Sequence, residues 1–191
     1  MTESELIIAL KSGDQAAFRQ LIENNQVSLL KVCRGFLHNE SDAADIVQET
    51  FIEVFQSVSN FREEAKLSTW LYRIAVNKCL NLIRKRKFNN LVRLDMLFAA
   101  KNNPLQEIID ENPLPGNSLE NRERNSYIKK TVDQLPPNQR IAFILNKYQD
   151  LAYKEIAAVM GISVASVESL LHRAKLNVQR KLYTAYKKNI L

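Results

Sequence analysis

The sequence is poor in the residues that build disulfide scaffolds, metal centres and many-stranded sheets. Its 191 residues include 2 cysteines and 2 histidines, too few for a disulfide framework or a four-cysteine zinc site. The 4 glycines and 5 prolines leave few turns for a sheet of many strands. We therefore predict a helical protein with no metal and no cofactor.

The sequence also lacks long apolar stretches and catalytic constellations. Runs such as 6–10 and 141–145 have five residues, whereas a membrane-spanning helix needs about 20. The first residues, MTESELI, place acids where a signal peptide is positively charged. We expect a cytoplasmic protein without direct membrane insertion. Two isolated histidines, with no metal-ligand spacing and no phosphate-binding loop, also predict that it is not an enzyme.

The charge is present in alternating blocks along the chain. The net charge is +6, from 27 basic and 21 acidic side chains. Residues 1–60 hold 4 basic and 9 acidic side chains, whereas residues 61–93 hold 9 and 2. Residues 94–125 hold 3 and 6, and residues 126–191 hold 11 and 4. Two basic blocks indicate two surfaces for nucleic acid, although any single block is compatible with a solvated helix face.

The apolar spacing is helical in nearly all of the chain, which predicts an all-α fold. We expect one helix over 3–11, a second that starts after an N-cap at Asp14, and a third over 27–37. A fourth should run from an N-cap at Ser41 to about residue 58, and a fifth over 68–86. Residues 94–121 show no sustained period, and helical spacing returns near Arg122 with a break at Pro136-Pro137. The sequence thus predicts two small helical domains, 1–92 and 122–191, joined by a flexible acidic linker over 93–121.

The expected helix over 42–58 has two unlike faces. Its apolar face consists of Ala43, Val47, Phe51, Val54 and Val58. A step of about 100° per residue gathers a second set on another face: Asp42, Asp45, Glu49, Ile52, Glu53 and Gln56. This second face is acidic with one apolar side chain, which is compatible with docking onto a basic partner surface or with simple solvation.

The expected helix over 68–86 carries a basic, amide and aromatic strip. The strip consists of Trp70, Arg73, Asn77, Asn81 and Arg84, with Lys78 beside it. The preceding loop adds Phe61, Arg62 and Lys66. Guanidinium groups bind phosphate, amides read base edges and aromatic rings stack on bases, so the strip is typical of single-stranded nucleic-acid sites. For Trp70, packing as an anchor is the alternative.

Residues 153–172, YKEIAAVMGISVASVESLLH, fit a helix-turn-helix pattern. Ala157 is small enough for two helices to cross closely, and Gly161 supplies the turn. Internal apolar contacts are expected from Ile156, Met160, Ile162, Val167 and Leu170. Ser163 is the expected N-cap of a second helix over 164–175, which would present its exposed side chains to a major groove. An ordinary helical hairpin is the alternative.

Together these segments resemble bacterial RNA polymerase sigma factors of the extracytoplasmic function (ECF) group. The similar segments are LKSGDQAAFRQLI, SDAADIVQETFIEVFQ, KLSTWLYRIAVNKCLNLIRKRK and LPPNQRIAFILNKYQDLAYKEIAAVMGISVASVESLLHRAK. The resemblance covers nearly the whole chain except the linker. A layout of two domains with no third between them distinguishes this group from the larger primary sigma factors.

The resemblance implies a role for each surface. The acidic helix would dock on the β′ clamp of core RNA polymerase through Asp45, Gln48, Glu49, Phe51 and Glu53. The loop and strip would recognise and melt the promoter −10 element, capturing an extruded base, through Phe61, Arg62, Lys66, Ser68, Trp70, Arg73, Asn77, Lys78, Asn81 and Arg84. The helix-turn-helix would touch the β flap and read the −35 element as duplex DNA through Ser163, Ala165, Ser166, Glu168, Ser169, His172, Arg173 and Lys175.

The resemblance also implies partners and leaves one position uncertain. The linker would thread towards the active cleft of the polymerase, and an anti-sigma factor, often membrane-anchored, is an expected partner. Many relatives carry Lys or Arg where this chain has Glu168. A carboxylate there repels phosphate but accepts a hydrogen bond from a cytosine amine, so the −35 preference does not follow from basic relatives. The competing hypothesis is a stand-alone helix-turn-helix regulator, which leaves the acidic helix and the strip unexplained.

Overall fold

The structure, a computed structural model, describes the backbone of residues 2–99 and 119–187 and the side chains of residues 2–90 and 124–187. Within this part the chain forms eight α-helices and one 3₁₀ turn, without a strand. The prediction of an all-α fold with two small helical domains is therefore confirmed.

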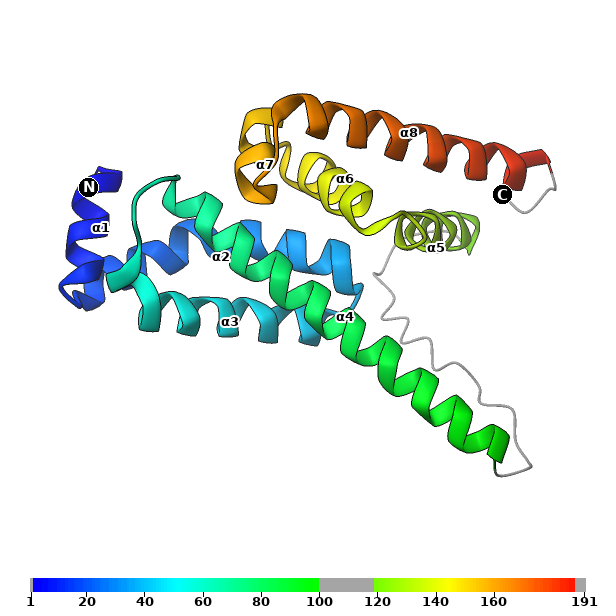
Figure 1. The fold of residues 1–191 in the computed structure, drawn as a ribbon, viewed down its shortest axis with the longest axis horizontal. Helices are drawn as coiled ribbons and strands as arrows, with labels where there is room; N and C mark the ends of the chain where they lie inside the picture. The colour runs from blue at the N-terminus through cyan, green and yellow to red at the C-terminus, as the bar shows by residue number, and fades with distance from the viewer. Residues whose placement is uncertain (1, 100–118, 188–191) are drawn as a thin grey trace.

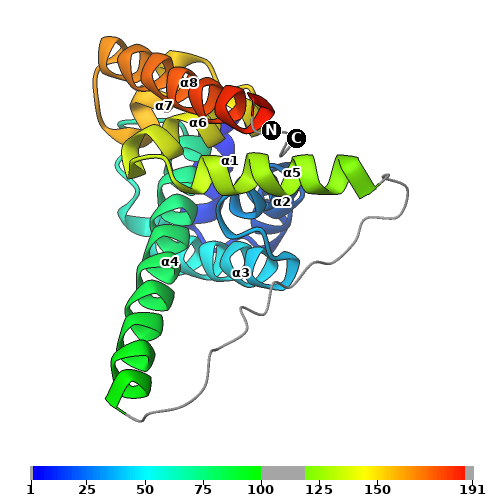
Figure 2. The same cartoon turned by 90° about the vertical axis from the view of Figure 1, so that its right-hand side faces the viewer.

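The N-terminal domain contains α1 (Glu3–Lys11), α2 (Gln15–Leu37), α3 (Glu40–Ser57), the 3₁₀ turn η1 (Val58–Asn60) and α4 (Leu67–Ala99). The helices α2, α3 and α4 pack on one another, α1 covers one end of this bundle, and the C-terminal part of α4 projects away from it (Figure 1; Figure 2). The five predicted apolar residues of this segment are all buried: Ala43, Val47, Phe51 and Val54 of α3 and Val58 of η1. They face the core as the helical period predicts.

Local side chains set the helix starts of the N-terminal domain. Asp14 accepts hydrogen bonds from the backbone N–H groups of Ala16 and Ala17, which confirms it as the N-cap of α2. The predicted N-cap Ser41 is wrong, because α3 begins at Glu40 and Asn39 accepts from the N–H of Asp42 instead. Asparagine is as good an N-cap as serine, and the helix begins two residues earlier than predicted.

Two predicted helix boundaries are wrong because nothing in the chain interrupts the helix there. The expected helices before and after residue 27 are one helix, α2. Inside α2, the Asn25 side chain donates to the Leu21 carbonyl at 2.8 Å, and the helix continues through this polar segment. Likewise α4 continues past Arg86 to Ala99. The first proline after that point is Pro104, and without proline or glycine the backbone ladder continues.

The C-terminal domain contains α5 (Leu119–Asp133), α6 (Pro137–Gln149), α7 (Tyr153–Met160) and α8 (Val164–Lys187). Pro137 occupies the first turn of α6, so the predicted break at Pro136-Pro137 is confirmed. Most of the predicted linker lies outside the described residues, and its two ends belong to α4 and α5. The core of this domain is aliphatic and includes Ile144, Leu145, Ile156, Val167 and Leu171.

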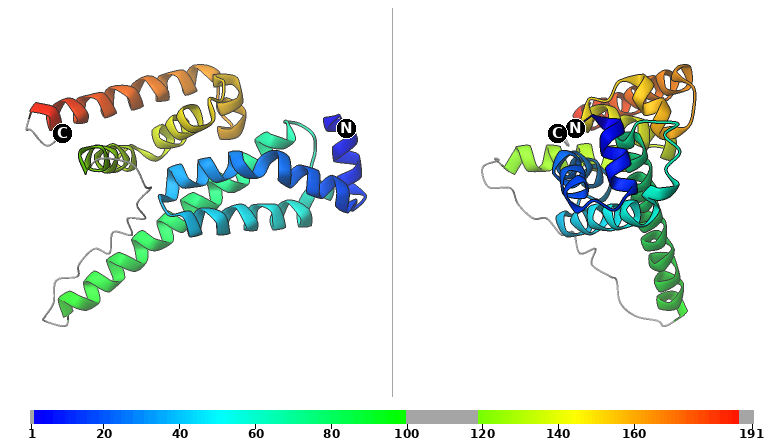
Figure 3. Two further views of the ribbon diagram at one scale, coloured as in Figure 1. Left: turned by 180° about the vertical axis from the view of Figure 1, so that it is seen from behind. Right: turned by 90° about the vertical axis from the view of Figure 1, so that its left-hand side faces the viewer.

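The two domains pack directly against each other. Figure 1 and Figure 3 show α6 and α7 lying along α2 and α4 of the N-terminal domain. Gly35 of α2 lies directly against α6: a Cβ atom at this position would be 3.0 Å from Ile144 Cγ2 and 3.3 Å from Tyr148 Cδ2. The absence of a side chain at position 35 is therefore what allows α6 to sit on α2 at this distance.

Cys33 and Cys79 are free and completely buried in the N-terminal domain. The neighbouring Cys33 thiol, as a hydrogen-bond partner, and then burial raise the pKa of the Cys79 thiol. A thiol with a raised pKa forms little thiolate, which is the reactive species. Because both side chains are completely buried, both residues act as small apolar core residues, in agreement with the apolar spacing around them.

Candidate docking face and nucleic-acid interface

The acidic face of α3 is exposed along its length. Asp45, Gln48, Glu49 and Glu53 point to solvent, whereas Phe51 is buried in the core. Phe51 packs in the core and also lines the groove described next, so its role as a polymerase contact stays a prediction. Beside the acids, an apolar groove of about 700 Å³ runs between α2 and α3, lined by Phe18, Ile22, Leu30, Val47, Ile52 and Phe55. The acidic face thus borders an open apolar surface, which the sequence indicated only through Ile52.

Two cations of α4 hold the carboxylates of α3. The Nζ of Lys78 lies 2.9 Å from Glu53 Oε2 and 3.4 Å from Glu49 Oε2. Partial burial would lower the pKa of Lys78, but the hydrogen bonds and charges of Glu53 and Glu49 raise it overall. Arg86 binds both oxygens of Asp42, at 2.6 and 2.7 Å. The predicted DNA contact Lys78 is therefore engaged with two predicted polymerase contacts.

The loop before α4 is attached to α1, which the sequence did not indicate. A carboxylate oxygen of Glu3 accepts a hydrogen bond from the Leu67 N–H at 2.7 Å, and Lys11 pairs with Glu63 at 2.6 Å. Glu63 is held at a positive φ of 60°. The start of α1 thus caps the start of α4. Of the predicted loop contacts, Arg62 and Lys66 are exposed and Ser68 is partly exposed.

Phe61 and Trp70 form a stacked pair at the base of the strip. Their ring centroids are 4.9 Å apart with an interplanar angle of 27°. Phe61 is buried and Trp70 is half-buried. Phe61 is therefore not available to a DNA base in this conformation. The half-buried position of Trp70 is compatible both with a packing anchor and with a ring that stacks on a base.

The rest of the strip is exposed on α4, but its first arginine is already bound. Arg73 Nε lies 3.0 Å from the carbonyl oxygen of Ala158 and 3.2 Å from that of Val159, both in the last turn of α7. Farther along α4, Asn77, Asn81 and Arg84 are exposed, and Arg84 donates to Asn81 Oδ1 at 3.2 Å. The strip therefore exists as predicted, with its beginning against the other domain.

The predicted helix-turn-helix is present as α7, a three-residue turn and α8. The chain bends by 102° between the two helices, within the range of such motifs. Gly161 adopts a left-handed φ of 67°, and the Ile162 N–H donates to the Ala157 carbonyl at 3.1 Å. The Ser163 hydroxyl accepts from the Ser166 N–H at 3.2 Å. The predicted turn and N-cap are therefore confirmed.

Of the five predicted apolar contacts inside this motif, Ile156 and Val167 are buried, Met160 and Leu170 are partly buried against the core, and only Ile162 is exposed. Ile162 is 36% exposed, because it lies in the turn and not on a helix face. Leu171, which the pattern did not include, is buried, whereas Leu170 is only partly buried. Ile156, Ala157 and Val167 are buried as predicted.

No single helix in the described part of the chain is long and apolar enough to cross a membrane. The helices α7 and α8 reach that length and hydropathy only when taken together, and the chain bends by 102° between them.

All predicted groove-reading side chains of α8 and its cap are exposed on one side of the helix: Ser163, Ala165, Ser166, Glu168, Ser169, His172, Arg173 and Lys175. Arg173 is held by Ser169, to whose hydroxyl it donates at 2.7 Å. An apolar groove of about 700 Å³ lies farther along the same helix and is lined by Phe143, Val178, Leu182, Tyr183 and Tyr186 among others. The C-terminal domain thus presents a polar reading face and an apolar groove.

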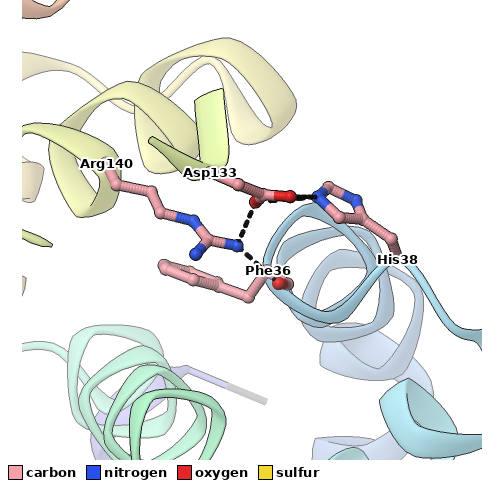
Figure 4. Close-up of polar contacts among 4 residues, drawn as sticks. All are labelled: Phe36, His38, Asp133 and Arg140. Atoms are coloured by element: carbon pink, nitrogen blue, oxygen red, sulfur yellow. Dashed lines mark hydrogen bonds and ion pairs between the residues drawn. The ribbon is translucent and has the colours of Figure 1, made fainter. Parts of the chain in front are cut away.

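A charged cluster at the domain boundary escaped the sequence reasoning. Arg140 of α6 donates to the Phe36 carbonyl oxygen at 2.6 Å and pairs with Asp133 at 2.5 Å, while His38 Nε2 lies 3.0 Å from both oxygens of Asp133 (Figure 4). Burial lowers the pKa of Arg140, and the charge of Asp133 opposes that effect. One sequence signal could have revealed this cluster: Arg140 falls on the apolar face of the helix, and a charged side chain there needs a buried partner.

Two family models match the chain. They are sigma-70 region 2, over residues 21–89, and sigma-70 region 4, over residues 126–178. Among curated proteins, an ECF RNA polymerase sigma factor of Bacillus subtilis, SigW, is 28% identical over 173 residues, covering 91% of this chain and 92% of that protein.

Two solved structures resemble the whole arrangement. CnrH in complex with the cytosolic domain of CnrY has a TM-score of 0.70 and 25% identity, covering 95% of this chain and 97% of that one. The sigma factor RpoE of Bartonella quintana, in complex with the anti-sigma factor NepR, has a TM-score of 0.63 and 23% identity, covering 87% of this chain and 96% of that one. At 23% identity, the similarity to the Bartonella quintana protein concerns the fold alone.

Proposed function

Because this chain belongs to the ECF group of the sigma-70 family of RNA polymerase sigma factors, we propose that it binds core RNA polymerase, recognises promoter −10 and −35 elements and melts promoter DNA. Sigma factors are initiation factors and not enzymes, so the family also confirms the prediction that this chain is not an enzyme. The observation that carries the proposal is the presence of regions 2 and 4 in one chain, each with its predicted surface exposed.

The acidic face of α3 binds the β′ clamp. This assignment is supported by the exposure of Asp45, Gln48, Glu49 and Glu53 beside an open apolar groove. Charged side chains at the rim of an interface steer association and fix its register, while an apolar centre supplies most of the affinity. Lys78 and Arg86 act from α4 as supports that orient the carboxylates.

The loop over 61–66 and the strip on α4 bind the −10 element and hold the unpaired strand. Exposed arginine and asparagine side chains along one helix can bind phosphates and base edges of a single strand. Melting then follows from capture, because each base bound outside the duplex shifts the equilibrium towards the open strand. No covalent step is required.

Replacing Asn77 by alanine should reduce promoter opening about fivefold or more while leaving affinity for core polymerase within about twofold. Asn77 is exposed on the strip of α4, and loss of one base-edge contact costs about 1–3 kcal/mol. Permanganate reactivity of unpaired thymines would measure opening, and a polymerase pull-down would measure binding. Equal loss of both would remove this role from Asn77.

The recognition helix α8 reads the −35 element as duplex DNA. Arg173 is exposed and suited to a guanine or a phosphate, and Lys175 to a phosphate. Glu168 sits on the same face, where its carboxylate favours a cytosine amine. The apolar groove on α5, α6 and α8 is the part of this domain suited to the β flap.

Two further assignments follow from the family. The Bartonella quintana sigma factor RpoE was solved with an anti-sigma factor, and we infer that this chain also has an anti-sigma partner. Its place of action is the cytoplasm, where core polymerase is found.

A gel shift with and without core polymerase distinguishes this function from that of a stand-alone regulator. A sigma factor should bind promoter fragments strongly only as part of the holoenzyme, because its two reading faces must be placed by the polymerase. Tight binding of a duplex by the chain alone, unchanged by added core enzyme, would favour the stand-alone helix-turn-helix regulator instead.

A further inference from the structure

The first helix of the chain, α1, carries none of the predicted contacts with polymerase or DNA. We propose that α1 holds the −10 loop (residues 61–66) in the shape that captures a promoter base, with Glu3 and Lys11 as the positioning residues. This inference rests on the proposed function of the loop and concerns how the loop selects its base. It assigns to α1 no direct contact with DNA.

The contacts of α1 reach both ends of the loop and its middle. Before the loop, α1 packs on η1. Within the loop, Lys11 Nζ lies 2.6 Å from Glu63 Oε1. After the loop, a carboxylate oxygen of Glu3 accepts a hydrogen bond from the Leu67 N–H at 2.7 Å. The loop runs alongside α1 between these points (Figure 1; Figure 3), so that loop and helix form one unit.

The hydrogen bond to Glu3 takes the place of a local N-cap of α4. The residue that precedes α4 is Lys66, and a lysine side chain has no hydrogen-bond acceptor. The first N–H groups of a helix need acceptors from outside the helix, and Glu3 supplies one from 64 positions away in the chain. A carboxylate at this end also interacts favourably with the helix dipole. The start of the helix that carries the promoter strip therefore depends on α1.

The capping of α1 itself uses a different acid. The Thr2 N–H donates to Glu5 at 2.8 Å, and the Glu5 N–H donates to the Thr2 hydroxyl at 3.3 Å, which is a capping box. Buried apolar side chains fix the helix on the bundle: Leu6, Ile7 and Leu10. The two acids of the first turn thus have different tasks, because Glu5 caps α1 and Glu3 caps α4.

Lys11 stabilises a loop residue in an unfavourable backbone conformation. Glu63 has a φ of 60°, in the left-handed region, where a side chain crowds the backbone. Such a conformation persists only where neighbouring contacts impose it. The ion pair with Lys11 is such a contact, and it also neutralises a carboxylate in a loop that must approach phosphates. Lys11 thus acts on both the shape and the charge of the loop.

The fixed shape of the loop matters more for selectivity than for affinity. A loop that must be ordered on binding loses part of its interaction free energy, and loosely held groups discriminate poorly between similar ligands. Exposed cations of α4 such as Arg84 can bind phosphate without the loop. Loss of the α1 contacts should therefore reduce the preference between bases and leave sequence-independent binding largely intact.

The experiment uses the full chain in the holoenzyme with core polymerase. Single strands of about 20 nucleotides, randomised in the centre, are bound, and sequencing of the bound strands measures the enrichment of preferred bases. Fluorescence anisotropy with the unsorted library measures sequence-independent affinity. Hydrogen exchange in the free chain reports local opening of residues 61–69. Circular dichroism verifies that each variant keeps its helices.

Glu3→Ala should speed hydrogen exchange in residues 61–69 and lower the base enrichment about fivefold, with affinity for the unsorted library within about twofold. Glu3→Gln should retain the enrichment, because its amide oxygen can accept the same hydrogen bond. Glu5→Ala is the matched control, since it removes the same charge from the same turn. It should keep the enrichment within about twofold, because Glu5 bonds to Thr2 and not to the loop.

Lys11→Ala should lower the enrichment to a similar extent, whereas Glu63→Gly should retain it. Glycine adopts a positive φ without strain and leaves no carboxylate to neutralise. In the Glu63→Gly background, Lys11→Ala should therefore have no further effect. Lys31→Ala, at an exposed site of α2, is the matched control for the lost positive charge. An equal effect of Lys11→Ala in both backgrounds would assign Lys11 a direct contact with DNA and overturn its positioning role.

Unchanged enrichment in Glu3→Ala, with or without faster exchange in the loop, would overturn the role of α1. So would an equal loss in Glu5→Ala, or a loss in Glu3→Gln as large as in Glu3→Ala. If Glu3→Ala loses its helices, Lys11→Ala and Glu63→Gly decide the question. Absence of any base preference in the unsubstituted holoenzyme would overturn the proposed function of the loop together with this inference. A preference that disappears in Asn77→Ala but persists in both α1 variants would overturn this inference alone.

Discussion

Changing Glu49 and Glu53 together to lysine should weaken binding to core RNA polymerase by about 100-fold or more. Both carboxylates are exposed on the docking face of α3, and both lie against Lys78. The double change replaces two attractive charges by repulsive ones and leaves Lys78 among like charges. A factor of 100 corresponds to about 2.7 kcal/mol, which is within the range for charged contacts in a partly desolvated interface.

Surface plasmon resonance with immobilised core polymerase would measure this change, and added salt should reduce the difference. The matched control is Asp150→Lys with Glu168→Lys, which alters net charge equally at two exposed sites of the C-terminal domain. That control should bind within about threefold of the unsubstituted chain. If both double variants lose the same affinity, the effect is one of net charge and α3 is not the docking face.

Replacing Leu171 by alanine should lower the free energy of unfolding of the C-terminal domain by about 3 kcal/mol. Leu171 is 1% exposed in the core between α7 and α8, and its loss leaves a cavity in a small domain. The recognition helix would lose its fixed position, so the same change should abolish transcription that depends on a −35 element. The N-terminal domain should keep its stability, because Leu171 lies outside its core.

Two probes separate the domains in this experiment. The only tryptophan, Trp70, is in the N-terminal domain, so its fluorescence during urea unfolding follows that domain. Hydrogen exchange of α7 and α8 follows the other one. Leu176→Ala is the control, since Leu176 is 44% exposed on the same helix and should change stability by about 0.5 kcal/mol or less. Faster exchange in α3 than in α8 would contradict the assignment.

The sequence predicted the fold class and the faces of the helices because both depend on local periodicity. The apolar face of α3, the strip on α4 and the exposed face of α8 all follow from the helical repeat. The turn at Gly161 and the cap at Ser163 follow from local backbone chemistry. Helix lengths were less predictable, because α2 continues through polar residues and Gly35 to Leu37, and α4 continues to Ala99 through a stretch without proline or glycine.

Contacts between the domains were beyond the sequence. The bonds of Arg73 to α7, of Arg140 to the Phe36 carbonyl and of His38 to Asp133 join residues 85 to 104 positions apart. No periodicity links such positions. The engagement of Lys78 by Glu49 and Glu53 was also missed, since helical faces were read one helix at a time. The charge blocks of the sequence indicated the surfaces but not the bonds between Arg73 and the carbonyl oxygens of α7.

The central claim, that this chain directs core polymerase to promoters, is tested most directly by transcription in a purified system. Core RNA polymerase would be incubated with a library of mapped promoter fragments, with and without the protein, and transcript starts would be sequenced. The account predicts new starts that require the protein, share two sequence elements upstream and disappear with the Glu49→Lys and Glu53→Lys double variant. An identical set of starts with and without the protein, in a preparation that binds the polymerase, would contradict it.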